Sequence, residues 1–506
     1  VLEQNSIKKN VNMLLIGYDL GSSSVKASLV DSKTKKVLAL AQYPEREMTI
    51  DAPQENWAEQ HPSDWWSNVC KVTDLLFENT EFCRKDVIAI GIAYQMHGLV
   101  TLNSDNEPAR PAIIWCDSRA VSIGDKAFEE IGRKNCLEHL LNSPGNFTAS
   151  KLKWVQENEP ETYKTIRKIM LPGDYIAFKF TQKFTTTNTG LSEGVFWDFK
   201  NDQLSETIMD YYGFDYDLIP KIVPVFSNQG KITSAIANEF GFDPNTIVSY
   251  RAGDQPNNAF SLNVLEPGEI AATGGTSGVV YGVVDQLKFD PNNRVNTFAH
   301  INHTEKQRRL GVLLCINGTG SAYAWLRNNL AEDMDYFELE TLANSIEIGA
   351  DGLSFLPFGN GAERMLQNTI IAAQFEGLQF NKHKLAHMVR ACIEGIAFSF
   401  VYGIKCMHEL GLDPSVIKVG NDNMFQSSIF AKTIATLTHA EIQVKETNGA
   451  VGAAIGAGFG ANKIESLKVA FDQENIIKTY QADKSKLEAY TKAYEKWLKL
   501  LETKIK

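Results

Sequence analysis

The stretch MLLIGYDLGSSSVKASLVD (13–31) decides the fold of the N-terminal half. An apolar run comes first, then a turn of one glycine and three serines, then a second run rich in apolar residues. This pattern predicts a buried strand, a tight turn and a second strand. The turn has neither a lysine after its glycine nor the G-x-G-x-x-G spacing, which argues against a Walker loop and a dinucleotide-binding turn.

A second stretch, GEIAATGGTSGVVYGVV (268–284), repeats this layout with a Gly-Gly-Thr-Ser-Gly turn. Two such hairpins, near the start of each half, indicate a duplicated module. Further strands are predicted at VIAIGIAY (87–94) and PAIIWCD (111–117), and a helix at SKLKWVQEN (150–158). The sequence therefore predicts an α/β protein with two domains, joined near 263–267, and a cleft between them.

Two long helices are predicted in the second half. Residues 384–411 carry apolar side chains at three-to-four spacing for over five turns, which is typical of a core helix, with Gly411 as its C-cap. Residues 486–506 alternate apolar and charged side chains and predict an amphipathic helix on the outside of the fold.

Composition excludes several classes of protein. The chain has 506 residues and a formal charge of −11, which argues against nucleic-acid binding and against a polybasic membrane anchor. The longest run of apolar and small residues, 449–461, is too short to cross a bilayer. The first ten residues lack the apolar core of a signal peptide, and the seven cysteines form no CxxC pair. We therefore expect a soluble cytoplasmic protein with reduced thiols and no zinc site.

The two glycine-rich turns are candidate phosphate-binding loops. Glycine lets backbone N–H groups turn toward a phosphate, and hydroxyl side chains add further donors. A single turn of this kind is more often a plain hairpin, but equivalent turns in both halves favour phosphate binding. The candidate residues are Gly21, Ser22, Ser23, Gly275, Thr276 and Ser277, with Lys26 as a nearby cation that is otherwise a solvated strand residue.

Two aspartates stand at positions where chemistry is expected. Asp19 ends the first strand, where it either binds Mg²⁺ or caps the turn. Asp254 lies in YRAGDQPNNAF, a segment rich in amides and poor in other charges. A carboxylate in such a polar pocket is suited to act as a general base, and an Asx-turn is the alternative.

Polar residues also follow the predicted strands, where α/β folds usually bind their ligands. Gln95 and His97 end the strand at 87–94, although a lone histidine is more often a core residue. Asp117 follows the strand at 111–117 and either contacts substrate or pairs with Arg119. Trp57, in NWAEQHPSDWW, offers a ring face to a sugar or else belongs to the core.

Together these motifs resemble the FGGY family of carbohydrate kinases, within the actin-like ATPase superfamily, over nearly the whole chain. FTASKLKWVQEN (147–158) and QFEGLQFNKHKLAHMVRACIEG (374–395) resemble the two family signatures. DLGSSSVKA and TGGTSG resemble the paired phosphate loops, and WAEQ, YQMHG and IIWCDSRA resemble the xylulokinase branch. Residues 419–428 depart from the Gly-rich adenosine stretch of the family.

The resemblance implies two actin-like (ribonuclease-H-like) ATPase domains with a central cleft, which we expect at 1–263 and 264–506. It implies ATP and Mg²⁺ as reaction partners, with Asp254 as the catalytic base and Asp19 on the metal side. It also implies sugar contacts from Gln95, Met96, His97, Trp57, Asp117, Asp254 and Gln255, and adenosine contacts from Gly420, Asn421 and Asn423. A homodimer is compatible with the resemblance.

The expected reaction is transfer of the ATP γ-phosphoryl group to a ketopentose, which gives the 5-phosphate and ADP. D-xylulose is the expected ketopentose. L-ribulose, gluconate and deoxy-ketoses remain alternative acceptors, whereas glycerol is disfavoured by the YQMHG pattern. A non-metabolic actin-like ATPase would share the loops but would not need a polyol pocket. A glycosidase would use two carboxylates, such as Asp117 and Asp254, but would not need two phosphate turns.

Overall fold

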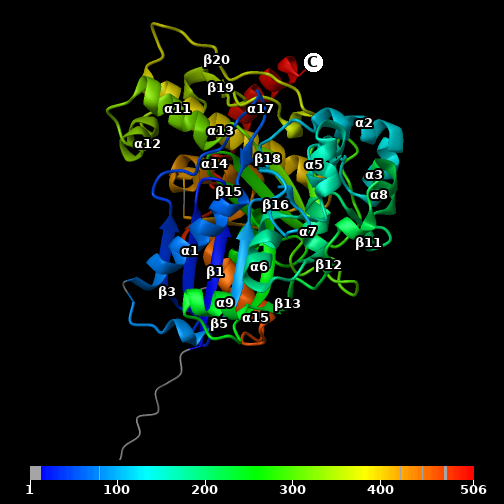
Figure 1. Ribbon diagram of the computed structural model, residues 1–506. Helices are drawn as coiled ribbons and strands as arrows, with labels where there is room; N and C mark the ends of the chain where they lie inside the picture. Colours follow the sequence, from blue (N-terminus) through cyan, green and yellow to red (C-terminus); the bar gives the residue numbers. More distant parts are fainter. Residues whose placement is uncertain (1–12, 79, 422, 447, 472–475, 506) are drawn as a thin grey trace, which may run out of the picture.

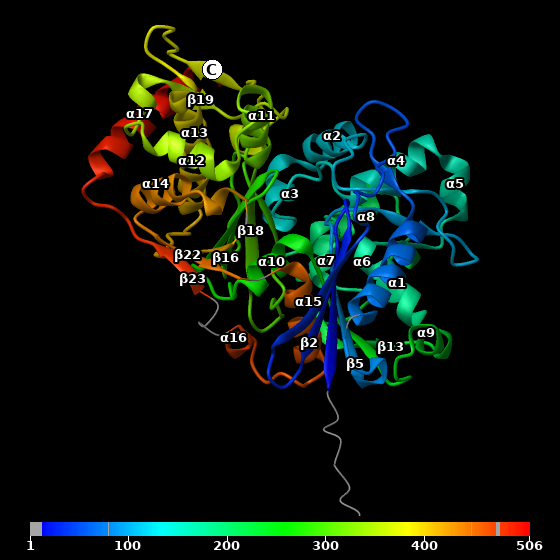
Figure 2. The same ribbon diagram turned by 90° about the vertical axis from the view of Figure 1, so that its left-hand side faces the viewer.

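The computed structural model describes residues 13–78, 80–421, 423–446, 448–471 and 476–505. The chain forms two lobes, each built around one large mixed sheet with helices packed on it (Figures 1 and 2). In the view of Figure 2 the N-terminal lobe, blue to green, lies beside the C-terminal lobe, green to red. The predicted α/β class with two ribonuclease-H-like domains is confirmed.

The N-terminal sheet has six strands in the order β13-β14-β5-β1-β2-β3. β1 pairs antiparallel with β2 and parallel with β5, and β5 pairs parallel with β14. The carboxyl ends of β1, β5 and β14 therefore meet at one edge of the sheet. The strands are β1 (Leu14–Leu20), β2 (Val25–Asp31), β3 (Val37–Tyr43), β5 (Val87–Tyr94), β13 (Phe226–Lys231) and β14 (Ile247–Gly253).

The C-terminal sheet has seven strands in the order β17-β18-β16-β15-β21-β22-β23. Its central part repeats the N-terminal plan, because β15 pairs antiparallel with β16 and parallel with β21. The duplication expected from the two hairpins is thus present in the sheets. The strands are β15 (Ile270–Gly274), β16 (Gly278–Val284), β17 (Asn296–Ala299), β18 (Leu310–Ile316), β21 (Val416–Gly420), β22 (Glu441–Lys445) and β23 (Ile476–Tyr480).

Helices cover both faces of the N-terminal sheet. α1 (Pro62–Glu78) and α6 (Pro172–Thr181) share a core with alternate residues of β1, whereas α15 (Gly449–Gly460) packs on the other face. The approach of α15 is so close that a Cβ on Gly17 would lie 1.9 Å from the carbonyl oxygen of Ala450. Only glycine permits this contact. Since α15 follows β22 in the chain, one helix of the C-terminal half lies on the N-terminal sheet, and the division at residue 263 stays a prediction.

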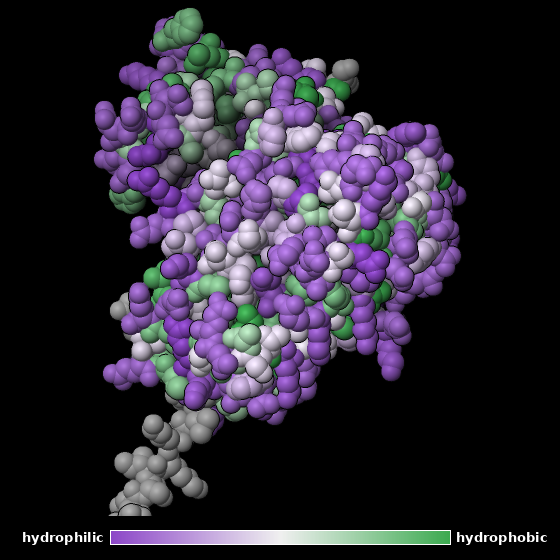
Figure 3. Space-filling model, in the orientation of Figure 1, coloured by the Kyte–Doolittle hydropathy of each residue, from purple (hydrophilic) through white to green (hydrophobic). Residues whose placement is uncertain are grey.

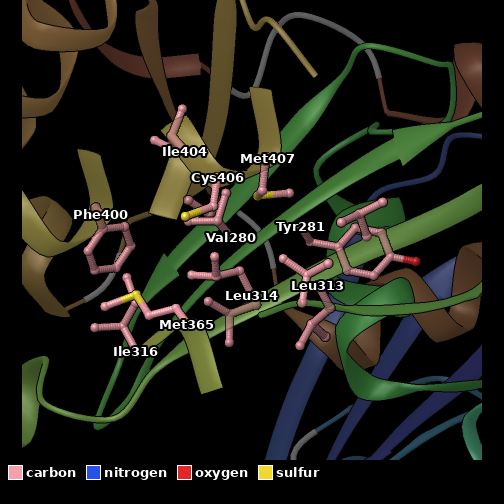
Figure 4. Close-up of a cluster of buried hydrophobic side chains, with 14 of the residues drawn as sticks. Val280, Tyr281, Leu313, Leu314, Ile316, Met365, Phe400, Ile404, Cys406 and Met407 are labelled. Atoms are coloured by element: carbon pink, nitrogen blue, oxygen red, sulfur yellow. The ribbon is translucent and has the colours of Figure 1, made fainter. Parts of the chain in front are cut away.

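The long predicted helix is α13 (Leu385–His408), which packs on the C-terminal sheet (Figure 4). Phe400, Ile404 and Met407 of this helix face Val280 and Leu314 in the figure. Among the described residues, α13 is the one helix that is long and apolar enough to cross a membrane, but 83% of its most apolar window is buried inside the fold. Burial of this kind is typical of a core helix.

Two local predictions differ in detail from the structure. The strand predicted at 111–117 is reduced to β7 (Ala112–Ile113), because the chain turns directly afterwards and the Asp117 side chain binds backbone N–H groups. α13 ends before Gly411, which lies beyond the Glu409 cap with a φ of 91° and closes a turn onto the His408 carbonyl.

The predicted outer helix at the end of the chain is α17 (Leu487–Lys504), which buries Tyr490, Tyr494, Trp497 and Leu501. The remaining helices are α2 (Val121–Ile131), α3 (Arg133–His139), α4 (Thr148–Asn158), α5 (Pro160–Thr165), α7 (Asn188–Glu193), α8 (Glu206–Tyr212), α9 (Ser234–Phe240), α10 (Asp254–Ser261), α11 (Gly320–Leu330), α12 (Tyr336–Asn344), α14 (Ser428–Thr438) and α16 (Leu467–Ala470). Short strands are β4 (Glu59–Gln60), β6 (Val100–Leu102), β8 (Lys168–Met170), β9 (Thr185–Thr186), β10 (Trp197–Asp198), β11 (Gln203–Leu204), β12 (Lys221–Ile222), β19 (Ser354–Leu356) and β20 (Gln374–Glu376).

The surface seen in the orientation of Figure 1 is mostly hydrophilic, with small, separate apolar areas (Figure 3). Scattered apolar residues of this kind are normal on a folded protein and carry no functional signal.

Candidate active site

A cavity of about 520 Å³ lies between the two lobes, at the edge where β1, β5 and β14 end. Many of the residues predicted from the sequence line it, namely Asp19, Gly21, Ser22, Ser23, Lys26, Gln95, Met96, His97, Asp254, Gln255 and Ser277. The C-terminal half adds Val279, Asn296, Leu313, Cys315 and Arg364. Both halves of the chain thus supply polar side chains to one cavity.

A larger cavity of about 860 Å³ lies elsewhere, near Pro224, Asn302 and Ser466. The described residues that line it include no residue of the two glycine-rich turns, and neither Asp19 nor Asp254. The smaller cavity is the candidate active site, because the two aspartates and residues of both glycine-rich turns line it.

The two aspartates reach the smaller cavity from parallel strands. Asp19 lies in β1, and Asp254 is the first residue of α10, directly after β14. Burial, and then the negative charge of Asp19, raise the pKa of Asp254 to about 7. Burial also raises the pKa of Asp19, while the charge of Lys26, its cross-strand neighbour, opposes that rise. An acid with a pKa near neutrality is suited to accept a proton at neutral pH.

The N-terminus of α15 lies directly against the Asp19 side chain. A Cβ on Gly449 would lie 2.4 Å from Oδ2 of Asp19 and 3.0 Å from Oδ1 of Asn258. The neighbouring Asn257 donates from Nδ2 to the Gly449 carbonyl oxygen at 2.9 Å, and accepts from the Tyr250 hydroxyl at 3.1 Å. α10 and α15 are therefore joined by a hydrogen bond at Gly449, next to the Asp19 carboxylate.

The first glycine-rich turn is tightly closed. The N–H of Gly21 donates to the Ser24 carbonyl at 3.0 Å, and Gln60 donates from Nε2 to the Ser22 carbonyl at 2.7 Å. The exposed ring of Trp115 reaches the same turn, with Nε1 3.4 Å from the Ser22 hydroxyl. The serines of this turn line the cavity, and hydrogen bonds from outside the turn hold it in place.

The second turn is tied to the start of α11. The carbonyl oxygens of Gly275 and Thr276 accept from the N–H groups of Gly320 and Ser321, at 2.9 and 3.0 Å. Of this turn, Ser277 lines the cavity, while Gly275 and Thr276 do not. The strand end at Gly274 faces Met424, so the segment after β21 lies next to this turn.

Gly420 and Asn421, two of the predicted adenosine residues, are not among the described residues that line the cavity. Gly420 ends β21, and Asn421 donates from its N–H to the Lys445 carbonyl at 3.0 Å and from Nδ2 to Glu446 at 3.3 Å. Asn423 begins a 3-10 turn, and its side chain lies outside what the structure describes. The adenosine assignment of these residues stays a prediction.

His97 has an unusual backbone that its neighbours hold in place. Its φ is 63°, in the left-handed region, which is rare for a residue with a side chain. The buried Lys151 donates from Nζ to the carbonyl oxygens of His97 and Ile114, at 3.0 and 2.9 Å. Burial lowers the pKa of Lys151 to about 8, so it is mostly protonated at neutral pH.

The His97 ring is fixed as well. Its Nδ1 lies 2.8 Å from the Glu193 carbonyl, and the ring packs against Phe147 and Phe298. Burial lowers the pKa of His97 to about 3, so the imidazole is neutral. A carbonyl only accepts, so Nδ1 carries the proton and Nε2 is a free acceptor for a hydroxyl donor.

Trp57 and Asp117 lie in the layer behind the cavity, and within the described chain neither lines it. The buried Asp117 carboxylate accepts from the Ala58 N–H at 2.6 Å and pairs with Arg119 at 2.7 Å. The Arg119 guanidinium in turn stacks on the Trp57 ring at 3.7 Å. The pairing of Asp117 with Arg119, one of the two alternatives left open by the sequence, is the arrangement found here, and a substrate contact stays a prediction.

Several residues that line the cavity were not predicted from the sequence, namely Trp115, Asn146, Phe147, Asn296 and Arg364. Trp115 stands in the quoted segment 111–117, and Asn146 and Phe147 directly precede the helix of the first signature, so position next to a motif could have found them. Arg364 has no such signal, because the tertiary fold alone brings its segment to the cavity.

Comparisons with known proteins agree with this geometry. Residues 14–261 match the N-terminal domain, and residues 270–461 the C-terminal domain, of the FGGY family of carbohydrate kinases. The chain is 29% identical over 501 residues to the xylulose kinase of Haemophilus influenzae, covering 96% of this chain and 99% of that protein.

Solved structures share the fold. The ligand-bound xylulose kinase and the gluconate kinase of Lactobacillus acidophilus each superpose with a TM-score of 0.88 at 22% identity. Each comparison covers 97% of this chain and 98% of the other. Since two kinases named for different sugars fit equally well, the fold does not separate the acceptors. The chain belongs to the FGGY family of carbohydrate kinases, enzymes that use ATP to phosphorylate sugars.

Proposed function

We propose that this sugar kinase transfers the γ-phosphoryl group of ATP to the 5-hydroxyl of a ketopentose, with D-xylulose as the preferred acceptor. The observation that carries the chemistry is the pairing of Asp254 with Asp19 in a cavity that His97 also lines. The acceptor is proposed from the curated relatives, several of which are named xylulose kinase at 26–29% identity.

Asp254 acts as the general base in this proposal. Its carboxylate takes the proton of the sugar hydroxyl as that oxygen attacks the γ-phosphorus, and ADP leaves on the opposite side. The pKa of about 7, raised by burial and by Asp19, makes it a stronger base than an ordinary aspartate while leaving it ionised above neutrality. Phosphoryl transfer needs little else beyond positioning and charge stabilisation.

The sugar is held beside Asp254 by groups that accept hydrogen bonds. His97 offers Nε2, and Asn146 offers Oδ1, a buried atom without a partner among the described residues. Asn146 donates from Nδ2 to the Asp117 carbonyl, which fixes the direction of its amide. Polyol hydroxyls are the donors that such acceptors bind, and a missing hydroxyl leaves them unpaired.

The phosphate chain of ATP lies across the two turns in this proposal. Gly21, Ser22 and Ser23 provide donors from one half and Ser277 from the other, with Lys26 as a cation beside Asp19. Gly275 and Thr276, which precede Ser277 but do not line the cavity, are assigned to the phosphates through the resemblance of the TGGTSG turn. We assign adenosine binding to Gly420, Asn421 and Asn423, which is supported by the contact between Met424 and the second turn.

Mg²⁺ fits the acidic side of the cavity. Asp19 offers hard carboxylate oxygens. Burial raises its pKa, and the positive charge of Lys26 lowers it. Mg²⁺ prefers one or two carboxylates plus phosphate oxygens, and no cluster of three ligating side chains occurs in the described chain. Bound there, Mg²⁺ would neutralise phosphate charge, and the protein groups would orient the acceptor and move its proton.

We propose that this protein acts in the cytoplasm. None of the seven cysteines, all within the described residues, forms a disulfide. Reduced thiols of this kind match a reducing compartment, where ATP and sugar substrates are also available.

The test is ADP release, measured by a coupled assay with D-xylulose, L-ribulose, gluconate, glycerol and rhamnulose. We expect the highest kcat/KM with xylulose, and loss of turnover with retained ATP binding in Asp254→Asn. Highest activity with gluconate would replace the ketose by an aldonate in the same mechanism. ADP release that no sugar stimulates would instead support an actin-like ATPase.

A further inference from the structure

Arg364 lines the cavity, and the segment that carries it is anchored in the core. It begins a 3-10 turn (Arg364–Leu366), between two side chains that the core holds. Met365 is fully buried against the C-terminal sheet, as Figure 4 shows, and Glu363 is fully buried and accepts from the Asn317 N–H at 3.1 Å. The residues on both sides of Arg364 are therefore fixed in the core, and this fixes the position of its backbone at the cavity.

The half-buried guanidinium of Arg364 forms no ion pair with any residue that the structure describes, although charges removed from bulk water are usually paired. Among the residues that the structure describes, its one hydrogen bond goes from Nη1 to Asn293 Oδ1, at a long 3.3 Å. Its Cζ lies 5.9 Å from the centre of the Phe147 ring, and Asp125 attracts it only from beyond ion-pair distance. Burial lowers the pKa of Arg364, yet a guanidinium stays charged, so several N–H donors remain for a ligand.

The position of these donors marks the sugar end of the cavity. Phe147 contacts both the Arg364 guanidinium and the His97 ring, so the two polar groups face the same space from opposite lobes. His97 and Asn146 offer acceptors there, which suit hydroxyl donors. Arginine is a donor only, so it suits an oxygen that accepts.

The chemistry of a ketopentose supplies such an oxygen. A 2-ketopentose closes its five-membered ring through the 5-hydroxyl, so a sugar that is phosphorylated at that hydroxyl must be open-chain. Its C2 carbonyl is then free and lies toward the end of the molecule remote from the reacting oxygen. A planar carbonyl beside the C1 hydroxyl offers two acceptors to a planar guanidinium.

We infer that Arg364 is a specificity-determining residue that donates to the C2 carbonyl and the C1 oxygen of the open-chain ketose. The inference rests on the proposed function and deepens it, because it explains how a ketose is distinguished from a polyol of the same length. The C-terminal lobe thereby binds the keto end of the sugar, while the N-terminal lobe binds its hydroxyls and supplies the base.

The experiment compares D-xylulose with xylitol and D-arabinitol, the two pentitols that reduction at C2 produces. We measure kcat/KM for each acceptor in the wild type, Arg364→Met, Arg364→Lys and the control Arg308→Met, an exposed arginine of the same lobe. ATP affinity by calorimetry and the melting temperature are recorded for all four proteins.

Loss of charged hydrogen bonds is expected to lower kcat/KM for xylulose in Arg364→Met by about 10- to 100-fold. The pentitols should lose far less, so the ketose-to-pentitol ratio falls at least about tenfold. Arg364→Lys should keep the charge but recover only part of the ratio, because an ammonium is not a planar fork. ATP affinity and the behaviour of Arg308→Met should match the wild type.

Two results would overturn the assignment while leaving the proposed function intact: equal losses with ketose and pentitols, or a weakened affinity for ATP. The first makes Arg364 structural, and the second makes it a phosphate ligand. A wild type that phosphorylates no ketopentose would overturn the proposed function itself, before any variant is compared.

Discussion

The Nδ1 atom of His97 lies 2.8 Å from the main-chain carbonyl oxygen of Glu193. This contact fixes the tautomer of the imidazole, because a carbonyl oxygen only accepts and Nδ1 must therefore donate. Nε2 is left as an acceptor, and a pKa of about 3, lowered by burial, keeps it so across the physiological range.

His97→Ala is therefore expected to alter sugar choice rather than nucleotide binding. We expect kcat/KM to fall about 10- to 100-fold with the preferred ketose, and less with an analogue that lacks the contacted hydroxyl. His61→Ala, an exposed histidine of the same lobe, is the matched control. A uniform loss with all sugars, together with a lower melting temperature, would show that His97 is only a packing residue.

Activity is expected to depend on pH through Asp254. Its carboxylate must be ionised to accept a proton, and its pKa is about 7 because of burial and the charge of Asp19. The kcat/KM for sugar should therefore rise about tenfold per pH unit below pH 7 and level off above it. A profile that is flat between pH 5.5 and 8 would remove Asp254 from the role of base.

The same raised pKa predicts a stability change of opposite sign. Folded Asp254 keeps its proton up to about pH 7, whereas an unfolded aspartate loses it near pH 4, so ionisation costs stability as pH rises through this window. Asp254→Asn cannot ionise and should melt higher than the wild type at pH 8, with a gap that shrinks toward pH 4. Turnover should fall by about 10²–10⁴-fold in the same variant. Equal melting temperatures at pH 8 would contradict the raised pKa.

Lys151 is expected to position His97 from behind. Lys151→Met removes two charged hydrogen bonds to carbonyl oxygens. Each lost bond should lower the free energy of unfolding by about 1.5–3 kcal/mol. Relaxation of the left-handed His97 should also raise KM for sugar more than KM for ATP. Lys153→Met, on the same helix, is the control, because the half-buried Lys153 ammonium pairs with Glu157 and does not contact His97. If both variants behave alike, Lys151 has no special link to His97.

Gly449 is expected to be essential for the placement of Asp19. In Gly449→Ala the new methyl group would lie 2.4 Å from Asp19 Oδ2, so the carboxylate must move. We expect kcat to fall at least about tenfold while the melting temperature changes little, because alanine is favoured over glycine in a helix. Crystals of the variant would show the displaced carboxylate, and full activity would mean that the position of Asp19 is not critical.

Some of this protein follows from the sequence alone. The two hairpins at 14–31 and 270–284, the long core helix and the aspartates at strand ends are all specified by local patterns of apolar residues, glycine and polar residues. Such patterns act over a few residues, since strand alternation, helical spacing and turn geometry are local properties. The duplicated α/β fold and the two aspartates of the cavity were therefore predictable.

Only the tertiary structure decided the rest. Asp117 is held by Arg119 and Ala58 instead of lining the cavity, and α15 crosses to the N-terminal sheet. Arg364 lies beside Phe147, which is more than 200 residues earlier in the chain. The pKa of Asp254 likewise depends on burial and on Asp19, more than 200 residues earlier. A side chain's partner, burial and charge environment are set by contacts between distant segments, and no local pattern in the sequence contains them.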